Sequence, residues 1–204
     1  QSQFFEFIAE AEFICGHNIF AHDLKYLEKD LAHHGLADAG IIDTLHFSPL
    51  LFPRKPYHKL VKDDKLQPDE LNNPLNDAIK AKTLLLEEID AFNRLEDNFK
   101  MILFLLLHKQ REFGAFFRLL NYSCDDDSLQ KLIGKKFCGK ICENANLSEI
   151  IGEKPVELAY CLSLINVFDD DLESKTDNLS ITPPWVSKNY PAFETVMFQL
   201  RNQP

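Results

Sequence analysis

The feature that most constrains this chain is a short apolar run that passes through a polar turn directly into a helix. Residues 13–15 are apolar and strand-like, and Gly16-His17-Asn18 follows them as a turn. Across residues 23–35, leucines recur at helical spacing up to a glycine, which is a natural helix stop. Polar groups at such a strand–helix junction lie at the carboxyl edge of the sheet, where open α/β sheets place their ligands.

The neighbouring segments continue the alternation of strands and helices. We expect a helix over residues 1–12, a second short strand over 40–43, and then a helix to residue 51 that Thr44 caps. A longer helix is expected from residue 74 to about residue 92. Strands that alternate with helices favour a parallel or mixed sheet. The residues that we expect the long helix to bury are Leu75, Ile79, Leu85, Leu86 and Ile89.

The character of the sequence changes after residue 92. Phenylalanine and leucine dominate residues 99–120, and residues 128–142 and 147–168 again have helical patterns without strand alternation. The sequence therefore predicts an α/β domain over residues 1–94, followed by an all-α domain over residues 95–204.

Composition excludes several classes of protein. The chain has 204 residues, is 45% hydrophobic and contains no apolar run long enough for a membrane span, and its start lacks the basic end of a secretion signal. Five cysteines, an odd number without a C-x-x-C pair, favour reduced thiols and a cytoplasmic location. The net charge of −10 argues against a broad basic DNA-binding face. This negative net charge is compatible with a carboxylate site for metal ions, because divalent ions bring their own positive charge.

Three segments, in the right order, resemble motifs of the DEDD exonucleases, the DnaQ-type 3′–5′ nucleases. His17, Asn18 and Asp23 match the second motif at its spacing, residues 41–45 match the strand end that follows, and Asp77 matches the third motif. The resemblance implies a partial ribonuclease-H-like (DnaQ-type) exonuclease fold. It also implies hydrolysis of phosphodiesters at DNA 3′ ends by two Mg²⁺ or Mn²⁺ ions, with Asp23 and Asp77 as metal ligands.

Two departures from the family pattern bear on activity. The first motif, an Asp-x-Glu on a strand, is absent from these residues, so the resemblance implies two further carboxylates upstream of Gln1. The position of the general-base histidine is occupied by Asn72, whose amide cannot take a proton from water near neutral pH. His58 and His22 are the alternatives for this base, and we favour His58. We expect these 204 residues alone to lack nuclease activity, because half of the metal ligands are missing.

The chemistry of the candidate residues is consistent with this resemblance. Two carboxylates, Asp23 and Asp77, that converge from different helices make a hard-oxygen site that suits Mg²⁺ or Mn²⁺. The alternative is that both are acids that helix dipoles favour in a first turn. The turn with His17 and Asn18 is expected to contact the terminal nucleotide. The irregular segment 53–74, with Lys55 and Lys59 among its cations, is either a solvated loop or a rim that binds phosphates.

The second half carries a further resemblance. Residues 150–160 and 180–186 resemble the segment that follows the exonuclease module of large RecQ-like DNA helicases. This implies a nucleic acid partner, a helicase motor fused downstream and a role in DNA repair. A second function remains open, in which a degenerate nuclease fold binds DNA ends or acts as a scaffold. A third alternative is an unrelated α/β protein whose matches arise by chance.

One other stretch combines aromatic and cationic residues. Its members are Lys109, Arg111, Phe113, Phe116, Phe117 and Arg118. At helical spacing, the phenylalanines favour a core, with the cations on the solvated face. Base stacking beside charge is the alternative.

Overall fold

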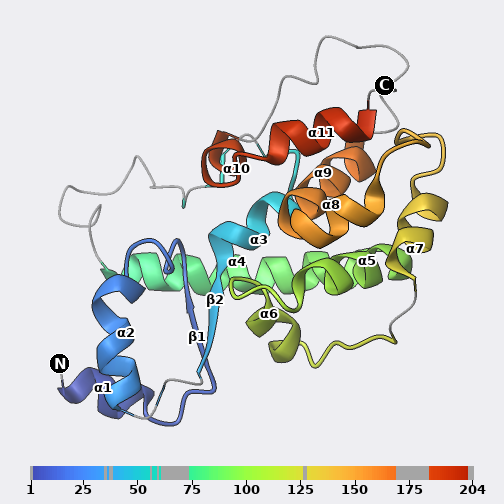
Figure 1. The fold of residues 1–204 in the computed structure, drawn as a ribbon. Helices are drawn as coiled ribbons and strands as arrows, with labels where there is room; N and C mark the ends of the chain where they lie inside the picture. Colours follow the sequence, from blue (N-terminus) through green and yellow to red (C-terminus); the bar gives the residue numbers. More distant parts are fainter. Residues whose placement is uncertain are drawn as a thin grey trace.

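The computed structural model describes residues 2–34, 36, 39–55, 57, 58, 60, 74–125, 128–168 and 184–201. It is mostly helical, with a small parallel sheet near its N-terminus (Figure 1). The first elements are α1 (Ser2–Ile8), β1 (Phe13–Gly16), α2 (Leu24–His33), β2 (Gly40–Asp43) and α3 (Thr44–Leu51). The helices that follow are α4 (Pro74–Arg94), α5 (Asp97–Leu107), α6 (Gly114–Leu119), α7 (Leu129–Lys136), α8 (Leu147–Glu153), α9 (Pro155–Phe168), α10 (Pro184–Asn189) and α11 (Phe193–Arg201).

The coarse fold agrees with the sequence prediction. Both predicted strands are present and pair in parallel, so the chain is a mixed α/β protein. The more specific ribonuclease-H-like fold stays a prediction, as does the division of the chain at residue 94. Among the helices that the structure describes, none has the length and apolar character needed to cross a membrane.

The register of the sheet divides the interior into two cores. Ile14 pairs with Ile41, and both pack into a small core that α1 and α2 cover. The adjacent pair, Cys15 with Ile42, points to the other face and joins the main core. Successive residues of a strand point to opposite faces, so four residues per strand are enough to serve both cores.

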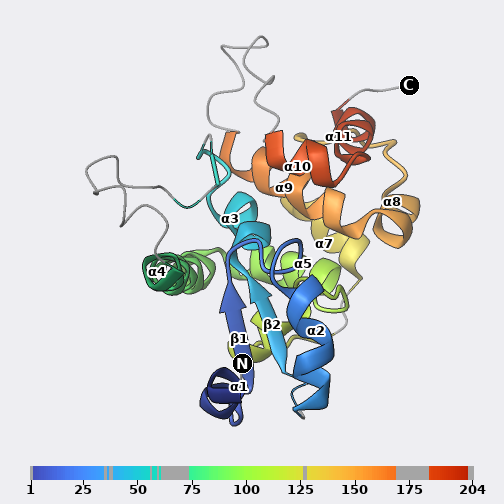
Figure 2. The same cartoon turned by 90° about the vertical axis from the view of Figure 1, so that its left-hand side faces the viewer.

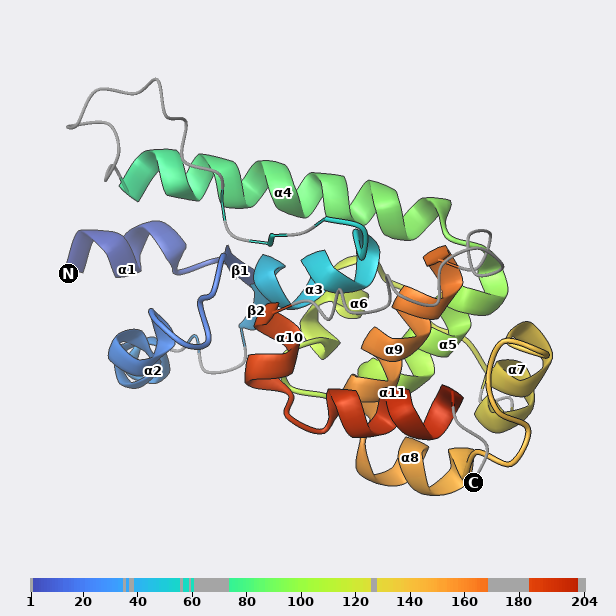
Figure 3. The ribbon, with the colours of Figure 1, turned by 90° about the horizontal axis from the view of Figure 1, so that it is seen from above.

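Helices cover both faces of this sheet. Figures 2 and 3 show α4 on one side of the strands and α2 on the other. α4 packs against β1 and α3, and α6 packs against β2. The main core continues from the sheet across residue 94, because Phe47 of α3 stacks on Phe116 of α6 and α3 also packs on α9.

The predicted buried face of α4 is only partly right, because Leu85 and Ile89 are half-buried and pack against the main core whereas the other three leucine and isoleucine side chains do not. Leu75, Ile79 and Leu86 are 64%, 53% and 57% exposed, whereas Ala81, Glu88 and Phe92 are buried. The helix has 21 residues and is therefore about 31 Å long, whereas paired strands lie only about 5 Å apart. A sheet of two strands therefore cannot cover the whole helix, and its burial follows its contacts with β1 and α3.

The predicted cap of α3 is also wrong. Asp43, and not Thr44, is the N-cap residue, and its carboxylate accepts the backbone N–H of Leu45. Thr44 is the first residue of the helix, and its hydroxyl bonds instead to the end of β1. An N-cap carboxylate satisfies one of the first free N–H groups of the helix, which explains why this helix begins where β2 ends.

Candidate functional site

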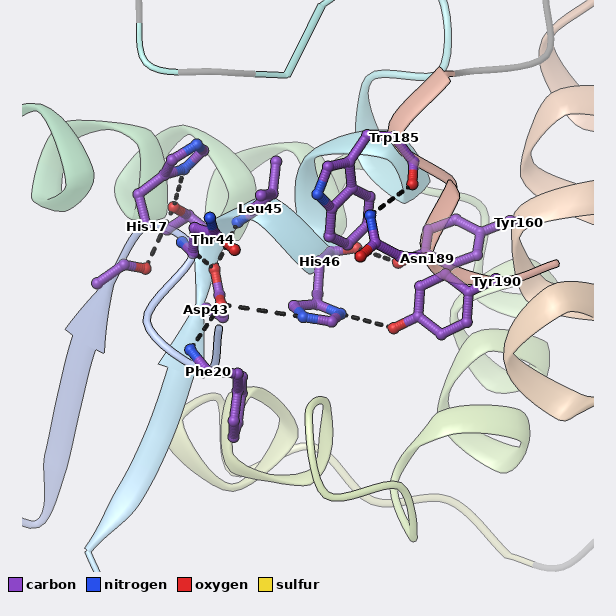
Figure 4. Close-up of polar contacts among 12 residues, drawn as sticks. His17, Phe20, Asp43, Thr44, Leu45, His46, Tyr160, Trp185, Asn189 and Tyr190 are labelled. Atoms are coloured by element: carbon purple, nitrogen blue, oxygen red, sulfur yellow. Dashed lines mark hydrogen bonds and ion pairs between the residues drawn. The ribbon is translucent and has the colours of Figure 1, made fainter. Parts of the chain in front are cut away.

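A single buried carboxylate joins the carboxyl ends of the two strands. Asp43 has no exposed surface, and its Oδ1 accepts the backbone N–H groups of Asn18 at 2.7 Å and Leu45 at 3.0 Å. Its Oδ2 accepts the N–H of Phe20 at 3.2 Å (Figure 4). Burial raises the pKa of Asp43, and these backbone hydrogen bonds oppose that rise. The carboxylate therefore fixes the turn that follows β1.

This turn determines where Asp23 lies. Asn18 has a φ of 62°, in the left-handed region that asparagine tolerates better than most residues. The backbone then closes as a helical turn, since the N–H groups of His22 and Asp23 bond to the carbonyls of Asn18 and Ile19. Asp23 is exposed at the N-cap position of α2, yet its carboxylate forms no capping hydrogen bond with the described first turn. Capping therefore does not explain the acid at this position.

One ring nitrogen of His17 has no hydrogen-bond partner among the described residues. The hydroxyl of Thr44 lies 3.4 Å from the carbonyl of Gly16, to which it donates, so it accepts from Nδ1–H of His17 at 2.8 Å. This leaves Nε2 as an acceptor, buried and without a partner among the described residues. Burial lowers the pKa of His17 to about 4, and the charge of Asp77 opposes this shift. The first turn of α4 therefore lies within electrostatic reach of the end of β1.

His58 is a buried histidine, and the charges of Lys55 and His17 influence its pKa. His58 is only 6% exposed, and its Nδ1 lies 2.8 Å from the hydroxyl of Ser48. Its pKa is lowered to about 4 by burial and by the charges of Lys55 and His17. Lys55 is exposed, with its ammonium 3.9 Å from the centre of the Phe52 ring. His58 is thus neutral at pH 7, and its role as a general base stays a prediction.

Glu88 is a buried carboxyl group that the sequence interpretation missed. It has no exposed surface, and neither side-chain oxygen has a partner among the described residues. Burial raises its pKa well above 4.5, and the nearby charge of Asp43 adds to this effect. The sequence contained a signal, because Ala81, Leu85, Glu88 and Phe92 recur at the spacing of one helix face.

His46 connects the sheet edge to the C-terminal helices. Its Nδ1 lies 2.7 Å from the hydroxyl of Tyr190, and its Nε2 lies 3.9 Å from Oδ2 of Asp43. The hydroxyl of Tyr160, on α9, donates to the carbonyl of His46 at 2.9 Å (Figure 4). No local sequence pattern indicates this network, because His46 is more than 100 positions away from both Tyr160 and Tyr190.

The structure therefore brings together only part of the predicted site. The charge of Asp77 influences the pKa of His17, and the charges of Lys55 and His17 influence the pKa of His58. Asp23 lies at the start of α2, across the sheet from α4 (Figure 2). Asn72 and Lys59 lie outside the described residues.

The predicted Mg²⁺ or Mn²⁺ cofactor requires oxygen donors from side chains that lie close together. Asp23 and Asp77 are both exposed carboxylates, the donor type that Mg²⁺ and Mn²⁺ prefer. Within the part of the chain that the structure describes, no three His, Cys, Asp or Glu side chains form a group able to hold a metal ion. Comparisons with protein-family models, with curated proteins and with solved structures gave no match for this chain.

Proposed function

We propose that this chain is part of a 3′–5′ exonuclease module in a larger, helicase-type DNA repair protein. The observation that carries the proposal is the packing of α4, whose first turn contains Asp77, against β1, which ends next to His17. The first turn of α4 and the end of β1 are separate in sequence, and the third and second motifs of the resemblance require them to meet. A parallel pair of strands with polar side chains at its carboxyl edge also suits a ligand site there.

Each residue has a distinct part in the proposed mechanism. Asp23 and Asp77 would hold divalent ions, whose chemistry there would be to activate a water and to neutralise charge on the scissile phosphate. The remaining carboxylates come from outside the described residues. The turn at His17 and Asn18, which Asp43 holds in place, positions the terminal nucleotide. Lys55, which is exposed on the segment after α3, contacts phosphate as a point charge.

A cleavage assay tests the enzymatic proposal. The longer protein that contains these residues should shorten a 3′-labelled oligonucleotide in Mg²⁺ or Mn²⁺. Asp23→Asn and Asp77→Asn should each reduce the rate by at least about a hundredfold, because each removes a charged ligand. Glu143→Gln, which removes an exposed carboxylate elsewhere, should leave the rate unchanged. Full activity in Asp23→Asn would show that Asp23 is not a required metal ligand.

Metal binding by the 204-residue chain provides a separate test. Mn²⁺ should broaden the amide NMR signals of residues near Asp23 and Asp77, and the corresponding Asn variants should lose this broadening at their own positions. We expect no oligonucleotide cleavage by this chain alone. Clear Mn²⁺-dependent cleavage would contradict the inference that further carboxylates are needed.

A second candidate function is a catalytically degenerate module that binds DNA ends or acts as a scaffold. The burial of His58 and its contact with Ser48 favour this alternative, because the ring nitrogens of this favoured base are not presented to water. In this case, the longer protein should bind a 3′-end oligonucleotide in the presence of Mg²⁺ without shortening it. Binding without cleavage would support the degenerate binding module, and cleavage would support the exonuclease.

A further inference from the structure

A large hollow lies at the β2 side of the sheet, away from His17 and Asp77. Its volume is about 940 Å³, and it is bounded by α2, β2, the end of α5 and α6. Figure 1 shows α2 on one side of the two strands and α6 on the other. Small-molecule sites typically measure about 300–1,000 Å³, so this hollow is large enough for a ligand of nucleotide size. Its floor is apolar and includes Leu31, Ile41 and Phe117.

The rim of the hollow is cationic, although the protein is acidic. Lys109, Arg111 and Arg118 line it, and Glu28 is the only acidic residue in the lining among the residues that the structure describes. The chain has 22 Lys and Arg against 32 Asp and Glu, so a surface patch would on average carry a net negative charge. The charge of the rim therefore marks this surface as a site for anions.

The cations of the rim are accessible to a ligand. Lys109 and Arg118 are exposed, and neither forms an ion pair with any described residue. Arg111 contacts Glu28 at 2.7 Å, but both side chains are about two-thirds exposed. Exposed ion pairs contribute little stability, so a phosphate with two or more charges competes readily for Arg111.

Flat side chains stand next to these cations. The His108 ring stacks on Phe104 with centroids 4.4 Å apart, and its Nδ1–H donates to the Phe104 carbonyl at 2.8 Å. This leaves Nε2 as the ring nitrogen that can face a ligand. Phe20 and Tyr122 also line the hollow. Planar side chains beside cations suit a ligand that has both a flat base and a phosphate.

We propose that this hollow binds a mononucleotide, with the phosphate at Lys109, Arg111 and Arg118 and the base among the aromatic side chains. The inference does not depend on the exonuclease proposal, because neither Asp23 nor Asp77 lines the hollow. It also revises the interpretation of this stretch. Phe113, Phe116 and Phe117 are core residues, as expected, but the cations beside them line a common hollow.

Calorimetric titration of the chain with adenosine 5′-monophosphate tests the proposal. The protein should bind this nucleotide at least about tenfold more tightly than adenosine or inorganic phosphate, because each of these lacks half of the contacts. Lys109→Gln and Arg118→Gln should each weaken binding by about tenfold. Ala32→Trp places a bulky ring at an exposed position in the lining and should block binding without a change of charge.

Matched controls separate this site from general charge attraction and from the exonuclease site. Lys135→Gln removes one exposed cation from α7, outside the hollow, and should change affinity less than about twofold. Asp23→Asn should bind the nucleotide normally. No binding at about 5 mM nucleotide, or equal losses in Lys135→Gln and Arg118→Gln, would overturn the proposal.

Discussion

The carboxylate of Asp43 accepts the backbone N–H of Asn18 at 2.7 Å, so one side chain connects the carboxyl ends of both strands. From the sequence alone, Asp43 is only one residue of the strand end that resembles the nuclease family, and metal binding is assigned to Asp23. In the structure, Asp43 is fully buried and supplied with backbone donors, whereas Asp23 is exposed. The two acids of this edge therefore have different environments, which mutations can distinguish.

Replacement of Asp43 should be far more destabilising than replacement of Asp23. Asp43→Ala leaves three N–H groups without their acceptor, one buried and two partly buried, and should lower the free energy of unfolding by about 2–4 kcal/mol. Asp23→Asn should change it by less than about 0.5 kcal/mol, because the side chain is exposed. Urea denaturation of both variants measures the difference. Equal effects would show that Asp43 does not fix the turn.

Asn18 should be replaceable by glycine but not by alanine. Its φ of 62° is strained for a residue with a Cβ, and glycine adopts this conformation without strain. Asn18→Ala should therefore destabilise the protein by about 1 kcal/mol more than Asn18→Gly, as measured by urea denaturation. The two variants lack the same amide group, so a difference between them reports the backbone alone. No difference would contradict a left-handed turn at this position.

Glu88 should make the protein less stable as pH rises. Its folded pKa lies well above the ordinary 4.5, so its contribution is fully present below pH 4.5 and is lost as pH rises through the folded value. Glu88→Gln removes this dependence. The advantage of the variant over the native chain should grow from pH 5 to pH 8, by at most about 1.4 kcal/mol per pH unit. A constant difference across this range would mean that Glu88 is not buried as an acid.

Three histidines should have the opposite effect at mildly acidic pH. The pKa values of His17, His46 and His58 are lowered from 6.5 to about 4, mainly by burial. Their contribution to stability is therefore present above pH 6.5 and is lost as pH falls towards 4. In the Glu88→Gln background, denaturation midpoints should fall between pH 6.5 and 5. Midpoints that stay level would show that these rings already titrate normally in the folded protein.

The contact between Tyr190 and His46 should contribute measurable stability. Tyr190→Phe removes the hydroxyl that lies 2.7 Å from Nδ1 of His46 and should cost about 1 kcal/mol. Tyr57→Phe is the matched control, because Tyr57 is 79% exposed and its hydroxyl has water available. Thermal unfolding of the two variants gives the comparison. A loss as large in Tyr57→Phe would mean that the burial of the hydroxyl at Tyr190 has no specific effect.

Local sequence patterns were sufficient for the elements around the candidate site. The apolar runs that end at Gly16 and Asp43 became β1 and β2, and the periodic segments between and after them became α2, α3 and α4. These features depend on propensity, turn chemistry and periodicity, which act between residues close together in the chain. The parallel pairing followed from the alternation of strands and helices.

The burial of α4 shows where such patterns fail. Its apolar residues occupy more than one face, so periodicity alone does not indicate which face is covered. The contacts with β1 and α3 bury Glu88 and leave Leu75 and Ile79 exposed. A carboxyl group on the buried face has a large desolvation penalty, yet local propensity is almost the same for an exposed glutamate and a buried one.

The sequence by itself determined which segments form strands and helices, and which polar residues stand at their ends. Only the tertiary structure decided that Asp43 would be buried, that the charge of Asp77 would influence the pKa of His17, and that the cations near α6 would line a hollow. The physical reason is that burial and electrostatic coupling depend on residues that are distant in the chain. Their contributions exist only once the chain has folded, so no short window of sequence contains them.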